Sequence, residues 1–150
     1  MNAPTYRKMG DHTETVQVDY DPQRITYAQL LDIFWKSHQP SQRPWLRQYK
    51  NVIFYHDTHQ RRLASASKIA LERKINRDVS TEEAPLNTFT MAEDYHQKYL
   101  LKRHDDLKQQ MYRIYPRHQD LVDSTAVARL NGYAGYHGTK DQPWGPQGVF

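Results

Sequence analysis

The sequence predicts an α+β or α/β sandwich, because short strand patterns alternate with helix patterns along most of the chain. A two-residue apolar period covers 14–20, and a short β-branched and aromatic run covers 51–55. Apolar residues at helical spacing follow each of these segments. Strands interleaved with helices are typical of layered folds. At 150 residues, the chain has the usual size of one compact domain.

The first predicted strand runs from Glu14 to Tyr20. Val16, Val18 and Tyr20 share one face of this segment, and polar residues occupy the other. This alternation predicts a half-buried strand. Pro22 closes it, because proline cannot donate to a ladder of hydrogen bonds.

A helix is predicted to begin after Thr26, because Thr26 and Gln29 have the spacing of a capping box. Its apolar stripe consists of Leu30, Leu31, Phe34 and Trp35. Pro40 and Pro44 then predict an irregular loop.

The run 51–55 predicts a buried strand, and Thr58 predicts the N-cap of a long polar helix. The buried seam of that helix is expected at Leu63, Ala66, Ala70 and Leu71. Further short strands are predicted at 79–83 and 89–91.

A helix is predicted from about Glu93 to Tyr115, where Pro116 ends it. Its apolar face is expected at Leu100, His104, Leu107, Met111 and Ile114. A last helix covers 124–130, capped by Ser124 and ended by Asn131-Gly132. The Gly- and Pro-rich segment 140–150 is predicted to be a disordered tail.

Composition restricts the function classes. Hydrophobic residues make up 37% of the chain and the mean hydropathy is -0.97, so the core is expected to be lean. The net charge is +4, but the basic residues are dispersed, so we expect no nucleic-acid partner. There is no cysteine, hence no disulfide and no thiol chemistry in this chain. No apolar run approaches the ~18 residues of a membrane span, and no signal peptide follows Met1, which predicts a cytoplasmic protein without a membrane partner.

Several short motifs occur together in a fixed order. They are Pro4-Thr5-Tyr6, Gly10-Asp11-His12-Thr13-Glu14, Tyr20-Asp21-Pro22, Ile25-Thr26-Tyr27 with Phe34-Trp35 and His38, Arg47-Gln48-Tyr49, Ile53-Phe54-Tyr55, and Ala92-Glu93-Asp94-Tyr95-His96-Gln97. In this order they resemble the A-type peptide methionine sulfoxide reductases over about residues 4–101. Ser124-Thr125-Ala126 and Leu130-Asn131-Gly132-Tyr133 are similar to a C-terminal extension in some members.

The resemblance implies a ferredoxin-like α+β fold, a two-layer sandwich with a small mixed sheet and packed helices. Residues 1–139 are then one domain of this type with a helical extension from about residue 102. The family places a Gly-Cys-Phe-Trp segment between its first strand and first helix, and this sequence has no such segment. We therefore expect a chain that lacks the first strand and helix.

The family reduces the S-epimer of methionine sulfoxide, in proteins or free, with no cofactor. A cysteine thiolate attacks the sulfoxide sulfur and becomes a sulfenic acid, which thiols ultimately supplied by thioredoxin resolve. Since this chain has no cysteine, we expect it to be inactive alone.

The resemblance assigns the remaining site residues. Glu14 aligns with the glutamate that protonates the sulfoxide oxygen, a role suited to a partly buried carboxyl with a raised pKa. Tyr6 and Tyr49 align with two tyrosines that hydrogen-bond this oxygen. A family aspartate shortly before Tyr49 has no counterpart in Pro44-Trp45-Leu46-Arg47-Gln48.

Other interpretations remain open. The chain could be a non-catalytic module that binds methionine sulfoxide or a protein, or a small basic nucleic-acid binder, which we rank last. His56 and His59 have a spacing that can bind a metal, but a third ligand is not evident, so no metal is expected. Without the resemblance, Glu14 is an ordinary solvated carboxylate.

Overall fold

The computed structural model describes residues 13–42 and 50–135, which form six helices and two strands. These residues divide into two compact units at Thr90 and Met91, called unit 1 and unit 2 below. Each unit has its own hydrophobic core. The α+β class predicted from the sequence is confirmed.

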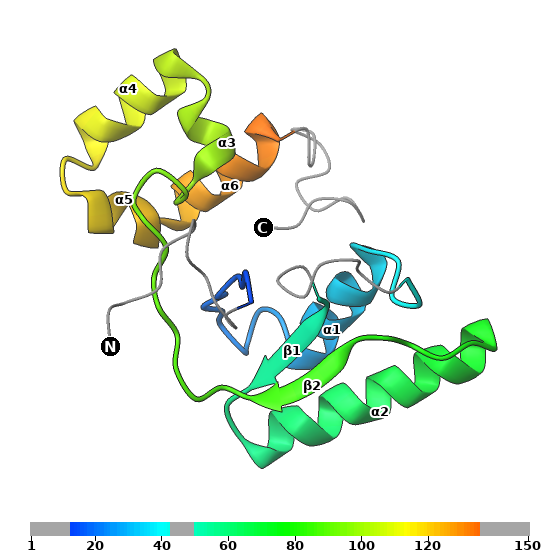
Figure 1. The fold of residues 1–150 in the computed structure, drawn as a ribbon. Coiled ribbons are helices and arrows are strands. Elements are labelled where there is room, and N and C mark those ends of the chain that lie inside the picture. Colours follow the sequence, from blue (N-terminus) through cyan, green and yellow to red (C-terminus); the bar gives the residue numbers. More distant parts are fainter. Residues whose placement is uncertain (1–12, 43–49, 136–150) are drawn as a thin grey trace. The chain divides into compact units, whose positions relative to one another are not determined.

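Unit 1 is built on a strand–helix–strand motif (Figure 1). Strand β1 (Val52–Tyr55) leads into helix α2 (Thr58–Ile75), which returns the chain to strand β2 (Glu82–Pro85). The strands pair in parallel, with Val52 opposite Glu82 and Tyr55 opposite Pro85. Because parallel neighbours need a long crossover, the helix between them follows from the pairing. Of the described residues, only this parallel pair forms a sheet, so the expected mixed sheet is not seen there.

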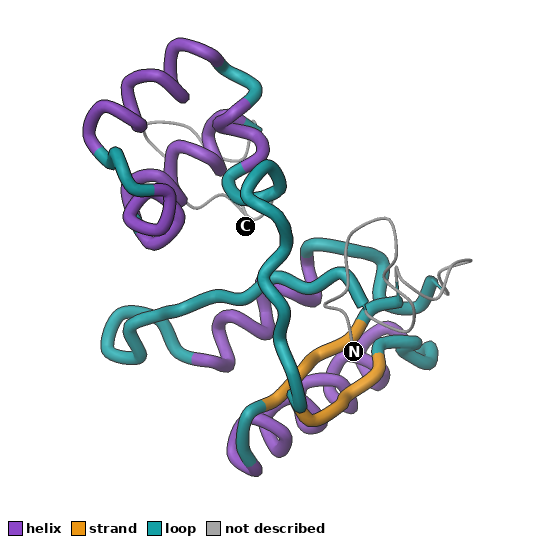
Figure 2. Tube along the Cα trace, turned by 60° about the vertical axis from the view of Figure 1, so that its left-hand side comes forward, coloured by secondary structure: helices purple, strands orange, loops and turns teal. Residues whose placement is uncertain are grey.

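Helix α1 (Tyr27–Lys36) precedes this motif and packs against α2, which also contacts both strands (Figure 2). The predicted capping box is confirmed: Thr26 accepts from the Gln29 N–H at 3.3 Å, and Gln29 Oε1 accepts from the Thr26 N–H at 2.8 Å. The core of unit 1 joins the helices to β1 through five buried residues, Leu31, Trp35, Ile53, Ala64 and Val79.

The strand predicted from Glu14 to Tyr20 is wrong. This segment has no strand pairing, and Val16 is 66% exposed. Its alternation would suit a half-buried strand, but a strand also needs an edge to pair with, and no described segment pairs with it.

The later strands of unit 1 are also corrected. The strand predicted at 79–83 lies instead at Glu82–Pro85, and 89–91 forms no strand. Val79 is buried, as its apolar character suggested, but it lies in a loop and not in a strand. Its backbone N–H donates to the Glu72 side chain. Pro85 fits an edge strand, and the next N–H, of Leu86, donates to Tyr55 O at 2.9 Å.

Helix α2 begins and packs differently from the prediction. The N-cap is Asp57, which accepts from the Gln60 N–H at 2.7 Å, and Thr58 is the first helical residue. Leu63 and Leu71 lie in the buried seam as predicted, but Ala66 and Ala70 are exposed. Ala64 and Ile75 complete the seam in their place. Asn76, in the left-handed region at φ 50°, ends the helix, as asparagine does at many helix C-termini.

Unit 2 is entirely helical in its described residues and contains α3 (Tyr99–Lys102), α4 (Asp105–Ile114), α5 (His118–Asp123) and α6 (Thr125–Ala134). Its core consists of Leu101, Met111, Leu121 and Val127. Each helix therefore contributes one residue to this core.

The single helix predicted from Glu93 to Tyr115 is wrong, because turns occupy 94–98 and the helix that follows ends at Lys102. His104 is extended (φ −105°, ψ 99°), and Asp105 and Asp106 open a new helix, where acidic side chains favour the positive end of the helix dipole. The predicted stop before Pro116 is confirmed. His104 and Ile114, expected on the apolar face, are exposed.

Helix α6 begins at the predicted cap, where Ser124 accepts from the Val127 N–H at 3.3 Å. It does not end at Asn131-Gly132 but continues to Ala134. Asn131 is buried and accepts from the Leu101 N–H at 3.0 Å, so it links α6 to α3 and does not terminate the helix. The expected tail at 140–150 lies outside the described residues, and the extent of the domain stays a prediction.

None of the helices in 13–42 and 50–135 is long and apolar enough to cross a membrane.

Candidate functional site

The acid predicted from the resemblance, Glu14, lies near the start of the described chain. Its side chain is exposed in an extended, unpaired segment. The neighbouring Thr15 hydroxyl donates to Thr13 O at 2.9 Å, which organises the segment only locally. The partly buried environment expected for a proton donor is not formed, because the strand that would carry Glu14 has no partner among the described residues. Tyr6 and Tyr49 lie outside the described residues.

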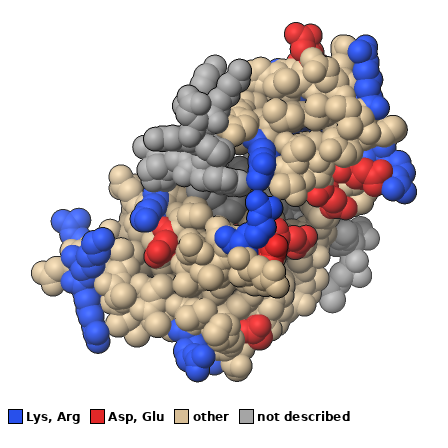
Figure 3. Space-filling model, turned by 180° about the vertical axis from the view of Figure 1, so that it is seen from behind, with Lys and Arg blue, Asp and Glu red and all other residues tan. Residues whose placement is uncertain are grey.

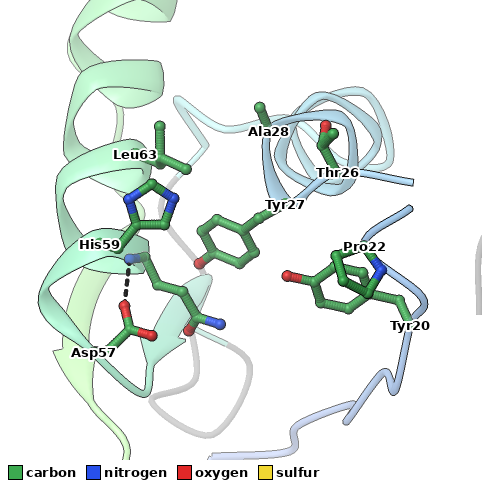
Figure 4. A pocket seen from close by; sticks show the side chains of 9 residues that line it. Tyr20, Pro22, Thr26, Tyr27, Ala28, Asp57, His59 and Leu63 are labelled. Atoms are coloured by element: carbon green, nitrogen blue, oxygen red, sulfur yellow. Dashed lines mark hydrogen bonds between the residues drawn. The ribbon is translucent and has the colours of Figure 1, made fainter. Parts of the chain in front are cut away.

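A second feature of unit 1 was not predicted. A cavity of about 320 Å³ lies where the start of α1 meets the start of α2. The turn after the Glu14–Tyr20 segment forms its third wall (Figure 4). Its lining residues are Tyr20, Pro22, Thr26, Tyr27, Ala28, Asp57, His59, Gln60 and Leu63.

Hydrogen bonds fix both helix starts that form this cavity. The Thr26–Gln29 capping box holds the first turn of α1. At α2, Gln60 donates its N–H to Asp57, and Gln60 Oε1 accepts from the His56 N–H at 2.9 Å. The lining therefore rests on two capped helix ends, and the backbone around it is held in place.

Tyr27 is the chemically unusual residue of the cavity. Its hydroxyl oxygen is buried and has no hydrogen-bond partner among the described residues. Burial, and after it the nearby Tyr20, Asp57 and Glu83, raise the pKa of Tyr27 to about 12. The phenol therefore stays protonated at neutral pH, in surroundings that disfavour added negative charge. The sequence analysis did not predict a role for Tyr27, because it named this residue only as part of the motif Ile25-Thr26-Tyr27.

The motif residues Phe34, Trp35 and His38 gather at the C-terminal end of α1, with His38 just beyond the last helical residue, Lys36. His38 Nδ1 lies 2.8 Å from Phe34 O, and since a carbonyl only accepts, this nitrogen carries the proton. Burial lowers the pKa of His38. The Trp35 indole N–H donates to the Ser67 hydroxyl at 3.0 Å and so fastens α1 to α2. These contacts give the motif a structural role in unit 1.

The motif Ala92–Gln97 forms turns in unit 2. Gln97 donates its amide to Ala92 O at 3.1 Å, and Asp94 lies 3.4 Å from His118 Nε2. His118 Nδ1 is also 3.3 Å from the Tyr112 hydroxyl, which links the turn to α4 and α5. Its described contacts therefore organise unit 2.

Metal ligation finds no support in the geometry. His56 and His59 are both exposed, and His59 Nδ1 faces Arg62 at 3.3 Å. Within 13–42 and 50–135, no three His, Cys, Asp or Glu side chains gather closely enough to hold an ion.

Comparison with known proteins defines the class of the chain. The family model for peptide methionine sulfoxide reductase matches residues 1–130. The chain therefore belongs to the peptide methionine sulfoxide reductase family, as the ordered motifs indicated.

Individual relatives agree with this assignment. A peptide methionine sulfoxide reductase of Drosophila melanogaster is 45% identical over 135 residues, which cover 88% of this chain and 53% of that protein. Peptide methionine sulfoxide reductase A5 of Arabidopsis thaliana is 42% identical over 137 residues, covering 87% of this chain and 53% of the relative. The enzyme of Methanosarcina mazei is 43% identical over 111 residues, covering 67% and 53%. The chain spans about half the length of these curated relatives.

Proposed function

We propose that this chain contributes the acid side of a peptide-methionine (S)-S-oxide reductase site, with Glu14 as the proton donor to the sulfoxide oxygen. The observation that carries the proposal is the family match over residues 1–130, which includes the motif ending in Glu14. The proposed substrate is methionine S-sulfoxide, in proteins or free. Tyr6 and Tyr49 are proposed to donate hydrogen bonds to the same oxygen.

The chemistry explains why the site needs an acid. A thiol and a sulfoxide react to give a thioether and a sulfenic acid, so two electrons pass from the cysteine sulfur to the substrate sulfur and the oxygen moves the other way. The S–O bond breaks readily only when its oxygen receives a proton. A positioned carboxyl that supplies the proton typically contributes about 10²–10⁴ in rate.

The reducing half of the reaction needs a thiol, and these 150 residues include no cysteine. A serine hydroxyl cannot substitute, because the oxidation ladder from thiolate to sulfenic acid belongs to sulfur. We therefore propose that the chain alone does not reduce sulfoxide and that a segment carrying the Gly-Cys-Phe-Trp motif is required. A second thiol then converts the sulfenic acid to a disulfide and water. Thioredoxin in the cytoplasm is the proposed final reductant, with no cofactor.

The test compares the chain with a fusion that carries a family-derived Gly-Cys-Phe-Trp strand and helix in front of Met1. Dabsyl-methionine S-sulfoxide and dithiothreitol are supplied, and the dabsyl-methionine formed is measured by chromatography. We expect no turnover by the chain and turnover by the fusion, with the R-epimer left unreduced. Turnover by the chain above a heat-killed control contradicts the proposal. Binding of a sulfoxide peptide by an inactive fusion would favour the non-catalytic binding module instead.

A nucleic-acid function has less support. On the face of the molecule in Figure 3, Lys and Arg side chains are interspersed with Asp and Glu. A surface that binds the phosphate backbone of a nucleic acid would instead gather basic residues in one stripe.

A further inference from the structure

We propose that the cavity lined by Tyr20, Tyr27 and Asp57 binds the cationic end of a basic side chain, such as a lysine of a partner or substrate protein. This inference goes beyond the proposed reductase function and does not depend on it, because all of its residues lie in the described part of unit 1.

The first argument is the unused hydrogen-bonding capacity of the cavity. The buried Tyr27 hydroxyl has no partner among the described residues. Leaving such a group unpaired is unfavourable, and sites that bind polar ligands are where unpaired groups are expected. Figure 4 shows this hydroxyl directed toward the start of α2, where Asp57 lies, and the Tyr20 hydroxyl directed toward the Tyr27 ring. An ammonium group that enters between the two helix starts could donate to the exposed Asp57 carboxylate and to the Tyr27 oxygen, which is closed to solvent in this structure.

The second argument is the sign of the local charge. After burial, the three groups that raise the pKa of Tyr27 are Tyr20, Asp57 and Glu83, all of which carry negative charge or none. The Asp57 Oδ1 accepts from the Gln60 N–H, and within the described part of the chain the carboxylate accepts no other hydrogen bond. Arg62 contacts the lining residue His59 at 3.3 Å, so a cation is favoured beside Asp57 and not beside His59.

The third argument is shape. A cavity of about 320 Å³ is at the small end of the ~300–1,000 Å³ range of ligand sites, which suits one side chain. Tyr20 and Tyr27 offer aromatic faces that attract cations, and Pro22 and Leu63 offer apolar surface for an alkyl stem. Lysine combines an alkyl stem with a charged end in this way.

Two other ligands fit less well. The starts of α1 and α2 would favour an anion, but the Thr26 and Asp57 caps already accept the N–H groups of Gln29 and Gln60. A carboxylate at the second helix start would also repel an anion. A metal ion would find only Asp57 and His59 as ligands, and no group of three is present in the described ranges.

The test uses isothermal titration calorimetry and ¹H–¹⁵N NMR shifts of the full chain with n-butylammonium, N-acetyl-lysine methylamide, 1-butanol and inorganic phosphate. We expect both amines to bind and to shift residues of the lining, with the lysine derivative at least as tight. Butanol has the same stem without the charge and is expected to bind at least about tenfold more weakly. Equal binding of butanol means an apolar cavity only, and tighter binding of phosphate means an anion site; either result overturns the proposal.

Substitutions test the residues. Asp57→Asn keeps a good N-cap, so the fold is retained while the charge is removed. It is expected to weaken amine binding about three- to fivefold, because Asp57 is exposed and water screens its charge. Tyr27→Phe is expected to weaken it several-fold. The matched controls Asp106→Asn and Tyr95→Phe alter exposed side chains of unit 2 and should change affinity less than about twofold. Unchanged binding by Asp57→Asn, with a native circular-dichroism spectrum, refutes the site.

Discussion

The buried amide of Asn131 offers a direct test of how unit 2 is held together. The N-cap residue of helix α3 is Lys98, which is in the left-handed region at φ 53° and makes no side-chain capping hydrogen bond. The N–H of Leu101, in the first turn of α3, would have no acceptor within the helix. Asn131, on α6, accepts it at 3.0 Å and so caps α3 from 30 residues away. Asn131→Ala should therefore destabilise unit 2.

The magnitude follows from burial. Leu101 is fully buried, so its N–H cannot turn to water after the substitution, and an unsatisfied buried donor costs about 1–3 kcal/mol. The higher helix propensity of alanine returns about 0.5 kcal/mol. The expected net loss is about 1–2 kcal/mol, which at a slope of about 2 kcal/mol per molar moves the urea midpoint by about 0.5–1 M.

Urea titrations followed by circular dichroism at 222 nm measure this loss, and hydrogen exchange of the Leu101 amide locates it. Gln110→Ala is the matched control, because it also removes an amide from a helix of unit 2 but at an exposed position. The reasoning is refuted if the two variants have the same midpoint, or if the Leu101 amide exchanges no faster in Asn131→Ala than in the unsubstituted chain.

Three further predictions concern unit 1. Tyr27→Phe removes a buried hydroxyl that lacks a partner, so the free energy of unfolding should stay the same or rise; a loss above about 1 kcal/mol in thermal melts contradicts this. The pKa of Tyr27 is raised to about 12 in the folded state, so the contribution of this residue to stability is complete below about pH 10 and is lost as the pH rises toward 12. Absorbance at 295 nm should show one late-titrating tyrosine, and Tyr27→Phe should remove it. Trp35→Phe and Ser67→Ala should each cost about 1–2 kcal/mol and be non-additive, since they remove the same 3.0 Å hydrogen bond; additive losses contradict it.

Local signals predicted the parts of the fold that local chemistry determines. The Thr26–Gln29 capping box, the buried run around Ile53 and the Ser124 cap were all predicted correctly, because a cap or a short β-branched run specifies its own conformation. The stop before Pro116 follows from the same kind of constraint.

Predictions that depend on a partner failed. The segment from Glu14 to Tyr20 alternates correctly but pairs with no described strand, and α2 buries Ala64 where the pattern favoured Ala66 and Ala70. The helix break at His104 could have been predicted from Asp105-Asp106, a helix-start signal inside a continuous apolar period.

The candidate site shows the same division. The ordered motifs were sufficient to predict the family, which the match over residues 1–130 confirms. The cavity around Tyr27 could not be predicted, because it forms only where α1 packs against α2 and its lining residues come from separate parts of the sequence. The roles of Glu14, Tyr6 and Tyr49 stay predictions.

The most direct test of the account is the dependence of sulfoxide reduction on Glu14. In the fusion with the Gly-Cys-Phe-Trp segment, kcat/KM for dabsyl-methionine S-sulfoxide is measured for the unsubstituted fusion and for its Glu14→Gln and Asp19→Asn variants. Asp19→Asn is the control, because it neutralises an exposed carboxylate of the same segment. We expect Glu14→Gln to lower kcat/KM by about 10²–10⁴ and Asp19→Asn to leave it within about twofold. Equal activity of the Glu14→Gln and unsubstituted fusions would contradict the assignment of Glu14 as the proton donor.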